Sequence, residues 1–149
     1  MKMYLRFAAM ILTSTVIMYG LMYLNTFRLD HLTFSETRTY MALIMGSCMA
    51  IVMLTYMIGM YPNRKLNAAI YLGSVVVFAG SLWLVRSQAT VDDTSYMSAM
   101  IPHHSIAILT SERANISDPR VRELADEIIE AQREEIAEMK RLISDLESE

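Results

Sequence analysis

Cysteine and histidine are scarce in this chain, and their scarcity excludes several kinds of site. The 149 residues include a single cysteine, Cys48, so no disulfide forms within the chain and no Cys-x-x-Cys zinc or redox motif exists. Lysine and arginine form no cluster, which excludes the usual signature of a nucleic-acid-binding protein. No nucleophile–base pair and no paired carboxylates stand out. We therefore expect no enzymatic activity and no organic cofactor.

Apolar residues, in contrast, are abundant and unevenly distributed. They make up 54% of the chain, and its mean hydropathy is +0.30. The first part of the sequence holds nearly all of the long apolar runs, whereas the last part holds most of the charge. This split predicts a membrane domain over residues 1–86 and a water-exposed domain over residues 87–149.

Three apolar segments have the length of transmembrane helices. They cover about residues 7–24, 40–61 and 66–85. About 20 helical residues cross a hydrocarbon core of roughly 30 Å, so each segment is long enough. The first segment follows Lys2 and Arg6, as a signal peptide would, but no small-x-small cleavage site comes after it. An uncleaved anchor is therefore the better interpretation.

The distribution of basic residues predicts the orientation. Lys2, Arg6 and the stretch 63–65 fall on one side of the membrane, and they slightly outnumber the basic residues of the other side. This bias predicts a multi-pass protein of the bacterial cytoplasmic membrane, with the lipid bilayer as its partner. The amino terminus lies in the cytoplasm and the C-terminal domain is periplasmic or extracellular. His31, between the first two segments, is expected to be a solvated loop histidine at the membrane surface.

The C-terminal domain has the pattern of an antiparallel helical hairpin, so the predicted fold class is all-α. The helices are expected at about 93–115 and 119–147, with Asp92 and Asp118 offering N-cap oxygens and Pro119 in the first helical position. Pro102 predicts a kink in the first helix, and a helix start nearby is the alternative. Two helices bury little core alone, so we expect a second copy to complete a four-helix bundle. Docking onto the membrane segments is the alternative.

Methionine and histidine gather on the first helix of the hairpin, in the stretch MSAMIPHH. Met97, Met100 and His104 share a face by their spacing, and His103 shares a face with Met100. Antiparallel pairing about residues 116–117 places His104 opposite Ile129. Three further residues come within about one helical turn, namely Gln132, Glu135 and Met139. Thioethers with imidazoles favour copper, and Cu(I) over Cu(II), whereas zinc normally takes Cys or three His and carboxylate ligands. The alternative is that these side chains only pack a helix interface.

The same stretch, followed by DPRVRELADEIIEAQREEIAEM, resembles the domain-of-unknown-function family 305, which includes CopM-like copper-binding proteins. The similarity covers about residues 94–143. It implies a ferritin-like helical bundle, of which this hairpin is half, and an extracytoplasmic copper site. The residues that match the family's metal-binding elements are Met97, Met100, His103, His104, Gln132, Glu135 and Met139.

The second apolar segment carries a ridge of methionines at four-residue spacing. It consists of Met41, Met45, Met49, Met53 and Met57. Packing at a helix interface is the favoured interpretation, and a ladder of ligands for Cu(I) is the alternative. Glycines in these segments, namely Gly46, Gly59, Gly73 and Gly80, are typical of close helix approach.

Two hypotheses for function follow. The first is a membrane-anchored protein that sequesters copper or hands it to a copper-handling partner, with Met97, Met100, His103, His104 and Met139 as ligands and Glu135 orienting an imidazole. The second is a structural or assembly module that binds no metal and oligomerises through its hairpin.

Overall fold

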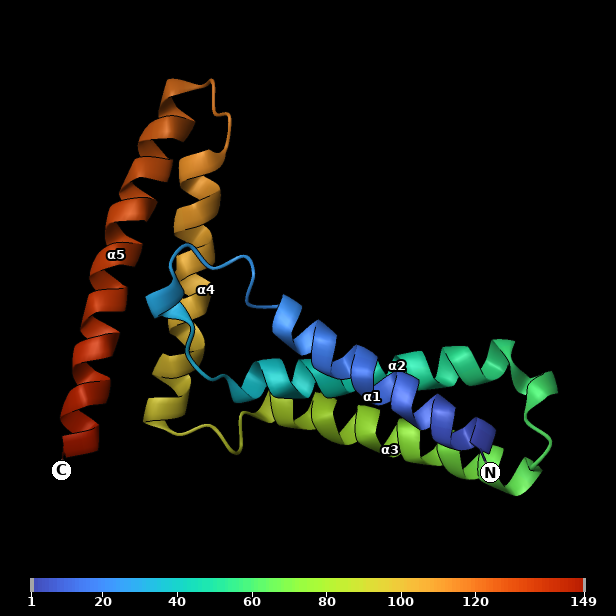
Figure 1. Cartoon of the computed structure of the whole chain (residues 1–149). Helices are drawn as coiled ribbons and strands as arrows, with labels where there is room; N and C mark the ends of the chain where they lie inside the picture. The colour runs from blue at the N-terminus through green and yellow to red at the C-terminus, as the bar shows by residue number, and fades with distance from the viewer. Residues whose placement is uncertain (1, 149) are drawn as a thin grey trace. The chain divides into compact units, whose positions relative to one another are not determined.

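The computed structural model of the chain, which describes residues 2–148, consists of helices joined by short connections (Figure 1). The α-helices are α1 (Lys2–Leu21), α2 (Glu36–Tyr56), α3 (Arg64–Ser87), α4 (Asp93–Arg113) and α5 (Pro119–Ser148). Two 3-10 turns also form, η1 (Leu29–His31) and η2 (Ile58–Met60). No strand occurs over 2–148, so the all-α prediction is confirmed.

The chain divides into two compact units that are not continuous in sequence. The N-terminal unit extends to residue 22 and resumes over residues 37–90, so it contains α1, α2 and α3. The C-terminal unit combines residues 23–36 with the chain from residue 91 onward, so it contains η1, α4 and α5. The connection between α1 and α2 thus belongs to the same unit as the hairpin, which the sequence did not indicate.

All three helices of the N-terminal unit are long and apolar enough to cross a membrane. This finding confirms the prediction that three apolar segments have the length of transmembrane helices. α1 and α3 also include residues outside the apolar runs, because charged side chains at a helix end do not interrupt the backbone hydrogen bonds. α2 ends five residues before the expected boundary at residue 61, where η2 tightens the chain before the turn.

The packing of the N-terminal unit places aromatic and small side chains at one end. Phe7, Leu54 and Tyr61 are buried together, and Met53 and Met57 pack against them, which agrees with a packing role for this part of the methionine ridge. Tyr4 beside them donates a hydrogen bond from its hydroxyl to Asn67 Oδ1 at 2.9 Å. This hydrogen bond gives the buried side chain of Asn67 a partner within the unit.

Helices α1 and α2 approach each other closely at Gly46. A Cβ atom on Gly46 would lie 2.4 Å from Thr15 Oγ1, which itself donates to the carbonyl of Ile11 at 2.8 Å. At Gly59, Gly73 and Gly80 a Cβ atom would meet nothing within 4 Å. The expectation of close approach therefore holds at Gly46 and is wrong at the other three glycines.

We expect Gly46→Ala to destabilise the packing of α1 on α2 by about 1–3 kcal/mol, because the added methyl group overlaps Thr15. Thr15→Ala removes the overlapping atoms, so the double variant Thr15→Ala/Gly46→Ala should recover most of the loss. Thermal unfolding in detergent measures the effect, with Gly73→Ala as the control that adds a methyl group in open space. An equal effect of both glycine variants would contradict the close approach.

The C-terminal unit is the predicted antiparallel hairpin, and the ends of its helices lie within two residues of the expected bounds. Asp92 caps α4 by accepting a hydrogen bond from the Ser95 amide at 2.7 Å. Asp118 accepts one from the Arg120 amide at 2.9 Å at the start of α5. α4 begins at Asp93 and passes through the buried Pro102, so a helix start near the proline is wrong. The core between the helices consists of Ile101, Ile108, Ile129 and Ile136.

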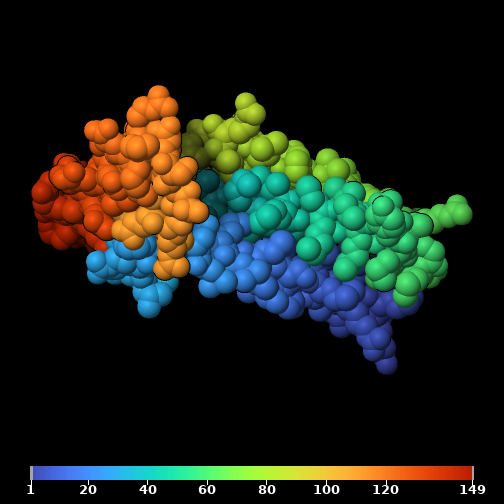
Figure 2. Space-filling view, turned by 90° about the horizontal axis from the view of Figure 1, so that it is seen from above, coloured from blue at the N-terminus to red at the C-terminus, as the bar shows by residue number. Residues whose placement is uncertain are grey.

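The segment of residues 23–36, which we call the docking loop, packs on this hairpin (Figure 2). His31 is 6% exposed, so the expectation of a solvated histidine is wrong. Its Nδ1 lies 2.9 Å from Ser105 Oγ, which also accepts a hydrogen bond from the Phe27 amide at 2.7 Å. The hydropathy of the docking loop does not indicate that His31 is buried, because its partner Ser105 lies 74 residues away in the sequence.

Candidate metal centre

Helix α4 presents its methionines and histidines at different depths. Met97 is buried, Met100 and His104 are half-buried, and His103 is exposed. The difference follows from helical geometry, because neighbouring residues point about 100° apart. The rings of His103 and His104 have centroids 6.1 Å apart. The imidazole of His103 is thus open to solvent beside a neighbour that faces α5.

His104 meets Glu135 of α5. The His104 Nδ1 atom lies 3.0 Å from Glu135 Oε2. This is the distance of an ion pair, but the two groups are not aligned for a hydrogen bond, so Nδ1 is left without a hydrogen-bond partner. Gln132 Nε2 donates to the same carboxylate oxygen at 3.1 Å. Because Nδ1 faces a carboxylate, Nε2 is the ring atom that remains for a ligand.

Burial keeps His104 in the neutral form that binds metals. Desolvation lowers the pKa of His104 below its ordinary value. The negative charge of Glu135 raises this pKa and offsets part of the effect, while the neighbouring His103 lowers it further. The lowered pKa favours the neutral imidazole, which has a lone pair available for a metal.

The register of the hairpin differs from the prediction. His104 was expected opposite Ile129, but the residue that it meets is Glu135, further along α5. Ile129 instead belongs to the core with Ile101 and Ile108. The connection between the helices sets this register, because α4 ends at Arg113 and an irregular stretch precedes Asp118. Glu135, predicted within about one turn of His104, is nevertheless beside it.

The two flanking methionines line a common groove. Met97 of α4 and Met139 of α5 both border a cavity of about 500 Å³, together with Tyr96 and Leu142. Met139 also packs against the isoleucine core. The structure therefore brings together two pairs among the predicted residues: His104 with Glu135, and Met97 with Met139. His103 and Met100 lie on α4, the helix that also carries His104 and Met97.

Across residues 2–148, no group of three or more His, Cys, Asp or Glu side chains is placed to hold a metal ion. A conventional site made of these ligands alone is therefore not found in this part of the chain. A metal at His104 would need thioether ligands in addition to imidazole. This donor set is compatible with a soft ion.

Two further polar residues near the site are buried, although no sequence pattern indicated it. Ser105 directly follows His104 and is fully buried, and His31 is its partner from the docking loop. A single serine between apolar residues of a helix looks like a surface residue. Only the pairing of distant segments reveals its role in holding the loop beside α4.

Comparisons with known proteins agree with this organisation. A family model described as a domain of unknown function, DUF305, matches residues 84–148. The uncharacterized protein L153 of Acanthamoeba polyphaga mimivirus is 30% identical over 144 residues, which cover 92% of this chain and 93% of that protein. The similarity to L153 thus extends through the membrane-length helices as well as the hairpin. No solved structure matches the chain. The chain therefore belongs to the family of the mimivirus protein L153, with a DUF305 domain at its C-terminal end.

Proposed function

We propose that the protein binds copper as cargo, Cu(I) in preference to Cu(II), on the α4–α5 hairpin, and that it sequesters the ion or hands it to another protein. The observation that carries this proposal is the pairing of His104 with Glu135 at 3.0 Å. A histidine that ligates a metal commonly directs its other ring nitrogen to a carboxylate, which fixes the ring and strengthens the ligand. Glu135 Oε2 lies close enough to His104 Nδ1 for this interaction, although the two groups are not aligned for a hydrogen bond.

The neighbouring side chains supply the remaining donors. Met100 and His103 lie four and one residues before His104 on α4, and Met97 and Met139 border the adjacent groove. Thioether sulfur is a soft ligand and prefers Cu(I) to harder divalent ions. Met100 lies one helical turn from His104, and the more distant Met97 and Met139 would have to reach the same ion through their flexible side chains. We infer storage or transfer without catalysis, because no nucleophile–base arrangement accompanies the site.

The resemblance to copper-binding members of the DUF305 family supports the same function. The proposed location follows from the basic residues near the membrane-length helices, with the amino terminus in the cytoplasm of a bacterium and the hairpin in the periplasm or outside the cell. Free copper and copper-handling proteins of that compartment would then be the source or the recipient of the ion.

A titration of the full chain in detergent with Cu(I), under anaerobic conditions and against a chromophoric chelator, tests the proposal. We expect one strongly bound ion per chain, and a loss of affinity greater than about 100-fold in His103→Ala/His104→Ala, since two imidazole ligands are removed. The full chain is required because the docking loop is part of the C-terminal unit. Met10→Leu/Met60→Leu removes two exposed methionines elsewhere and serves as the control. Equal copper uptake by the histidine variant and the native chain would refute the proposal.

A structural or assembly role is the second candidate, and one observation favours it. Helix α5 carries a stripe of exposed apolar side chains beside its buried face, made up of Val121, Leu124, Ile128, Leu142 and Leu146. A second hairpin packed on this stripe would form a four-helix bundle and a homodimer. The oligomeric state of the metal-free chain distinguishes the candidates. An assembly module forms the same oligomer with or without copper and loses it when Leu124 and Ile128 are replaced by Ser.

A further inference from the structure

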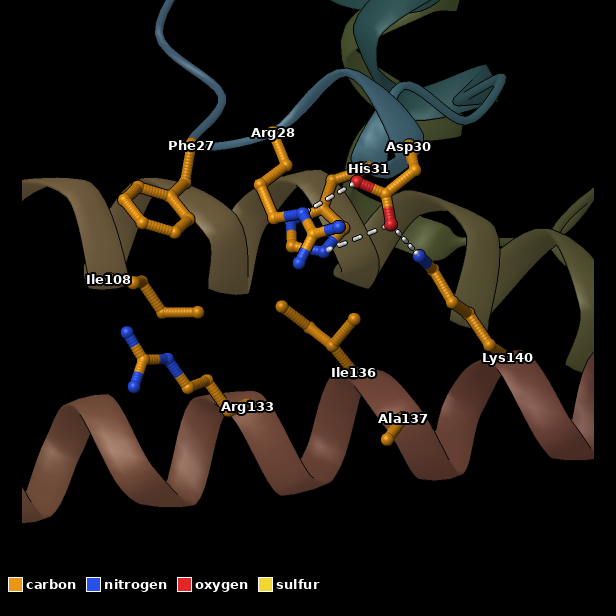
Figure 3. Close-up of a pocket in the computed structure, with 9 residues that line it drawn as sticks. All are labelled: Phe27, Arg28, Asp30, His31, Ile108, Arg133, Ile136, Ala137 and Lys140. Carbon is orange, nitrogen blue, oxygen red and sulfur yellow. Dashed lines mark hydrogen bonds and ion pairs between the residues drawn. The ribbon is translucent and has the colours of Figure 1, made fainter.

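A second pocket, lined by none of the candidate copper ligands, lies where the docking loop meets the hairpin, and it has a different chemistry. Its volume is about 380 Å³, and it is bounded by residues 27–31 of the docking loop together with parts of α4 and α5 (Figure 3). Part of its lining is apolar, from Phe27, Ile108 and Ile136. The cationic side chains that line it are Arg28, Arg133 and Lys140.

The positive charge of this pocket exceeds its negative charge. Asp30 is the one carboxylate of the lining, and it accepts hydrogen bonds from both Arg28 Nε and Lys140 Nζ at 2.9 Å (Figure 3). Arg133 pairs with Glu112, which lies outside the lining. The hydrogen bond from Lys140, aided by the charges of Lys140 and Arg28, lowers the pKa of Asp30 to about 2. Asp30 is therefore ionised near neutral pH, and with Glu112 included three cations meet two carboxylates.

His31 does not change this balance. Burial, reinforced by the charges of Lys140 and Arg28, lowers the pKa of His31, while the charge of Asp30 opposes the shift. Its Nδ1 atom is turned to Ser105 Oγ. The imidazole is therefore neutral near neutral pH, and it forms one wall of the pocket without adding a charge.

We propose that this pocket binds a phosphate group carried by an apolar molecule, such as the head group of an anionic phospholipid. Arginine presents planar forks of N–H donors that suit phosphate oxygens, and Arg28 and Arg133 flank the apolar lining from two different elements. The half-buried Phe27 offers apolar surface to the part of the ligand beyond the phosphate, and the buried Ile108 and Ile136 form the apolar floor beneath it. This site is independent of copper binding.

The connectivity of the chain gives a source for such a ligand. Phe27 follows the last residue of α1, Leu21, by only six positions, and α2 begins at Glu36, five positions after His31. Both helices are long and apolar enough to cross a membrane. A chain of six residues spans at most about 20 Å. Phospholipid head groups at the membrane surface are thus within reach of the loop that forms the pocket.

Calorimetric titration of the full chain in an uncharged detergent tests the site. The two probes are short-chain phosphatidylglycerol and inorganic phosphate, added separately. For Arg28→Gln/Arg133→Gln we expect the affinity for phosphatidylglycerol to fall by about tenfold or more, since two charge-assisted hydrogen bonds are lost. Arg113→Gln/Arg141→Gln removes the same charge from the same C-terminal unit, outside the pocket, and should bind as the native chain does.

Each outcome decides the proposal. Binding of phosphatidylglycerol that is lost only in the pocket variant supports the site and a lipid source, and binding of inorganic phosphate with the same dependence supports the site with a soluble source. No binding of either probe, or an equal loss in both variants, overturns it. If the glutamine variant loses helicity, Arg28→Lys/Arg133→Lys keeps the charge and removes the forks. This lysine variant should bind phosphatidylglycerol several-fold more weakly than the native chain does. If it binds phosphatidylglycerol as tightly as the native chain, the proposal is also overturned.

Discussion

Replacing Ser105 by alanine is expected to release the docking loop from the hairpin. The Ser105 hydroxyl is fully buried and serves two partners from the loop, the Phe27 amide at 2.7 Å and His31 Nδ1 at 2.9 Å. The amide donates to Oγ, so the hydroxyl hydrogen is free to be donated to the imidazole. Without the oxygen, both loop groups lose their partner while the apolar packing changes little. A buried polar group left unpaired costs about 1–3 kcal/mol. We therefore expect the free energy of loop opening to fall by about 2–4 kcal/mol.

Hydrogen–deuterium exchange of the full chain in detergent measures this opening. Amides of residues 27–33 should exchange much faster in Ser105→Ala, because exchange of a protected amide requires local opening. Thr110→Val is the matched control, since it removes an exposed hydroxyl of α4 that bonds only within its own helix. Unchanged exchange at residues 27–33 would mean that the other contacts, such as Asp30 with Lys140, hold the loop without Ser105.

The second large effect is expected from Glu135→Gln on copper binding. The carboxylate lies 3.0 Å from His104 Nδ1, where it can orient the imidazole and increase its basicity. Loss of such a carboxylate beside a metal-bound histidine typically weakens metal affinity by about 10–100-fold. Glutamine has the same shape and is exposed at this position, so the fold should be unaffected. Titration with Cu(I) against a chelator measures the change.

The control for this variant is Glu134→Gln. Glu134 is the neighbouring residue on α5, is exposed, and carries the same charge, so this variant separates the local role of Glu135 from a general electrostatic effect. Copper affinity should be almost the same in Glu134→Gln and the native chain. If both variants bind copper equally well, Glu135 is only a surface partner of His104 and takes no part in a metal site.

Most of the fold follows from local sequence signals. Apolar length located α1, α2 and α3, and the caps Asp92 and Asp118 with Pro119 located the ends of the hairpin helices within two residues. These signals are local because helix formation depends on neighbouring residues and backbone geometry. The docking loop had no such signal. Its burial depends on Ser105 and Lys140, which lie far along the chain from their partners, and no pattern within residues 23–36 encodes that pairing.

The candidate site was predictable in composition but less so in geometry. Helical spacing placed Met97, Met100 and His104 on one face, and Glu135 was expected within about one turn. The exact partner of His104 was not predicted, because a shift of one turn between two helices leaves the apolar periodicity of each unchanged. The basic pocket was also not found from the sequence. Arg28, Arg133 and Lys140 are isolated charges in the chain and come together only when the loop docks.

The division of the C-terminal unit between residues 23–36 and the chain beyond residue 90 has a consequence for how the protein is made. The docking loop leaves the ribosome early, whereas α4 and α5 follow all three helices of the N-terminal unit. Joining them closes a loop that contains all of α2 and α3, and contacts between residues so distant in sequence form late in folding. Docking of the loop therefore follows the synthesis of α2, α3 and the part of α4 that carries Ser105, the partner of His31.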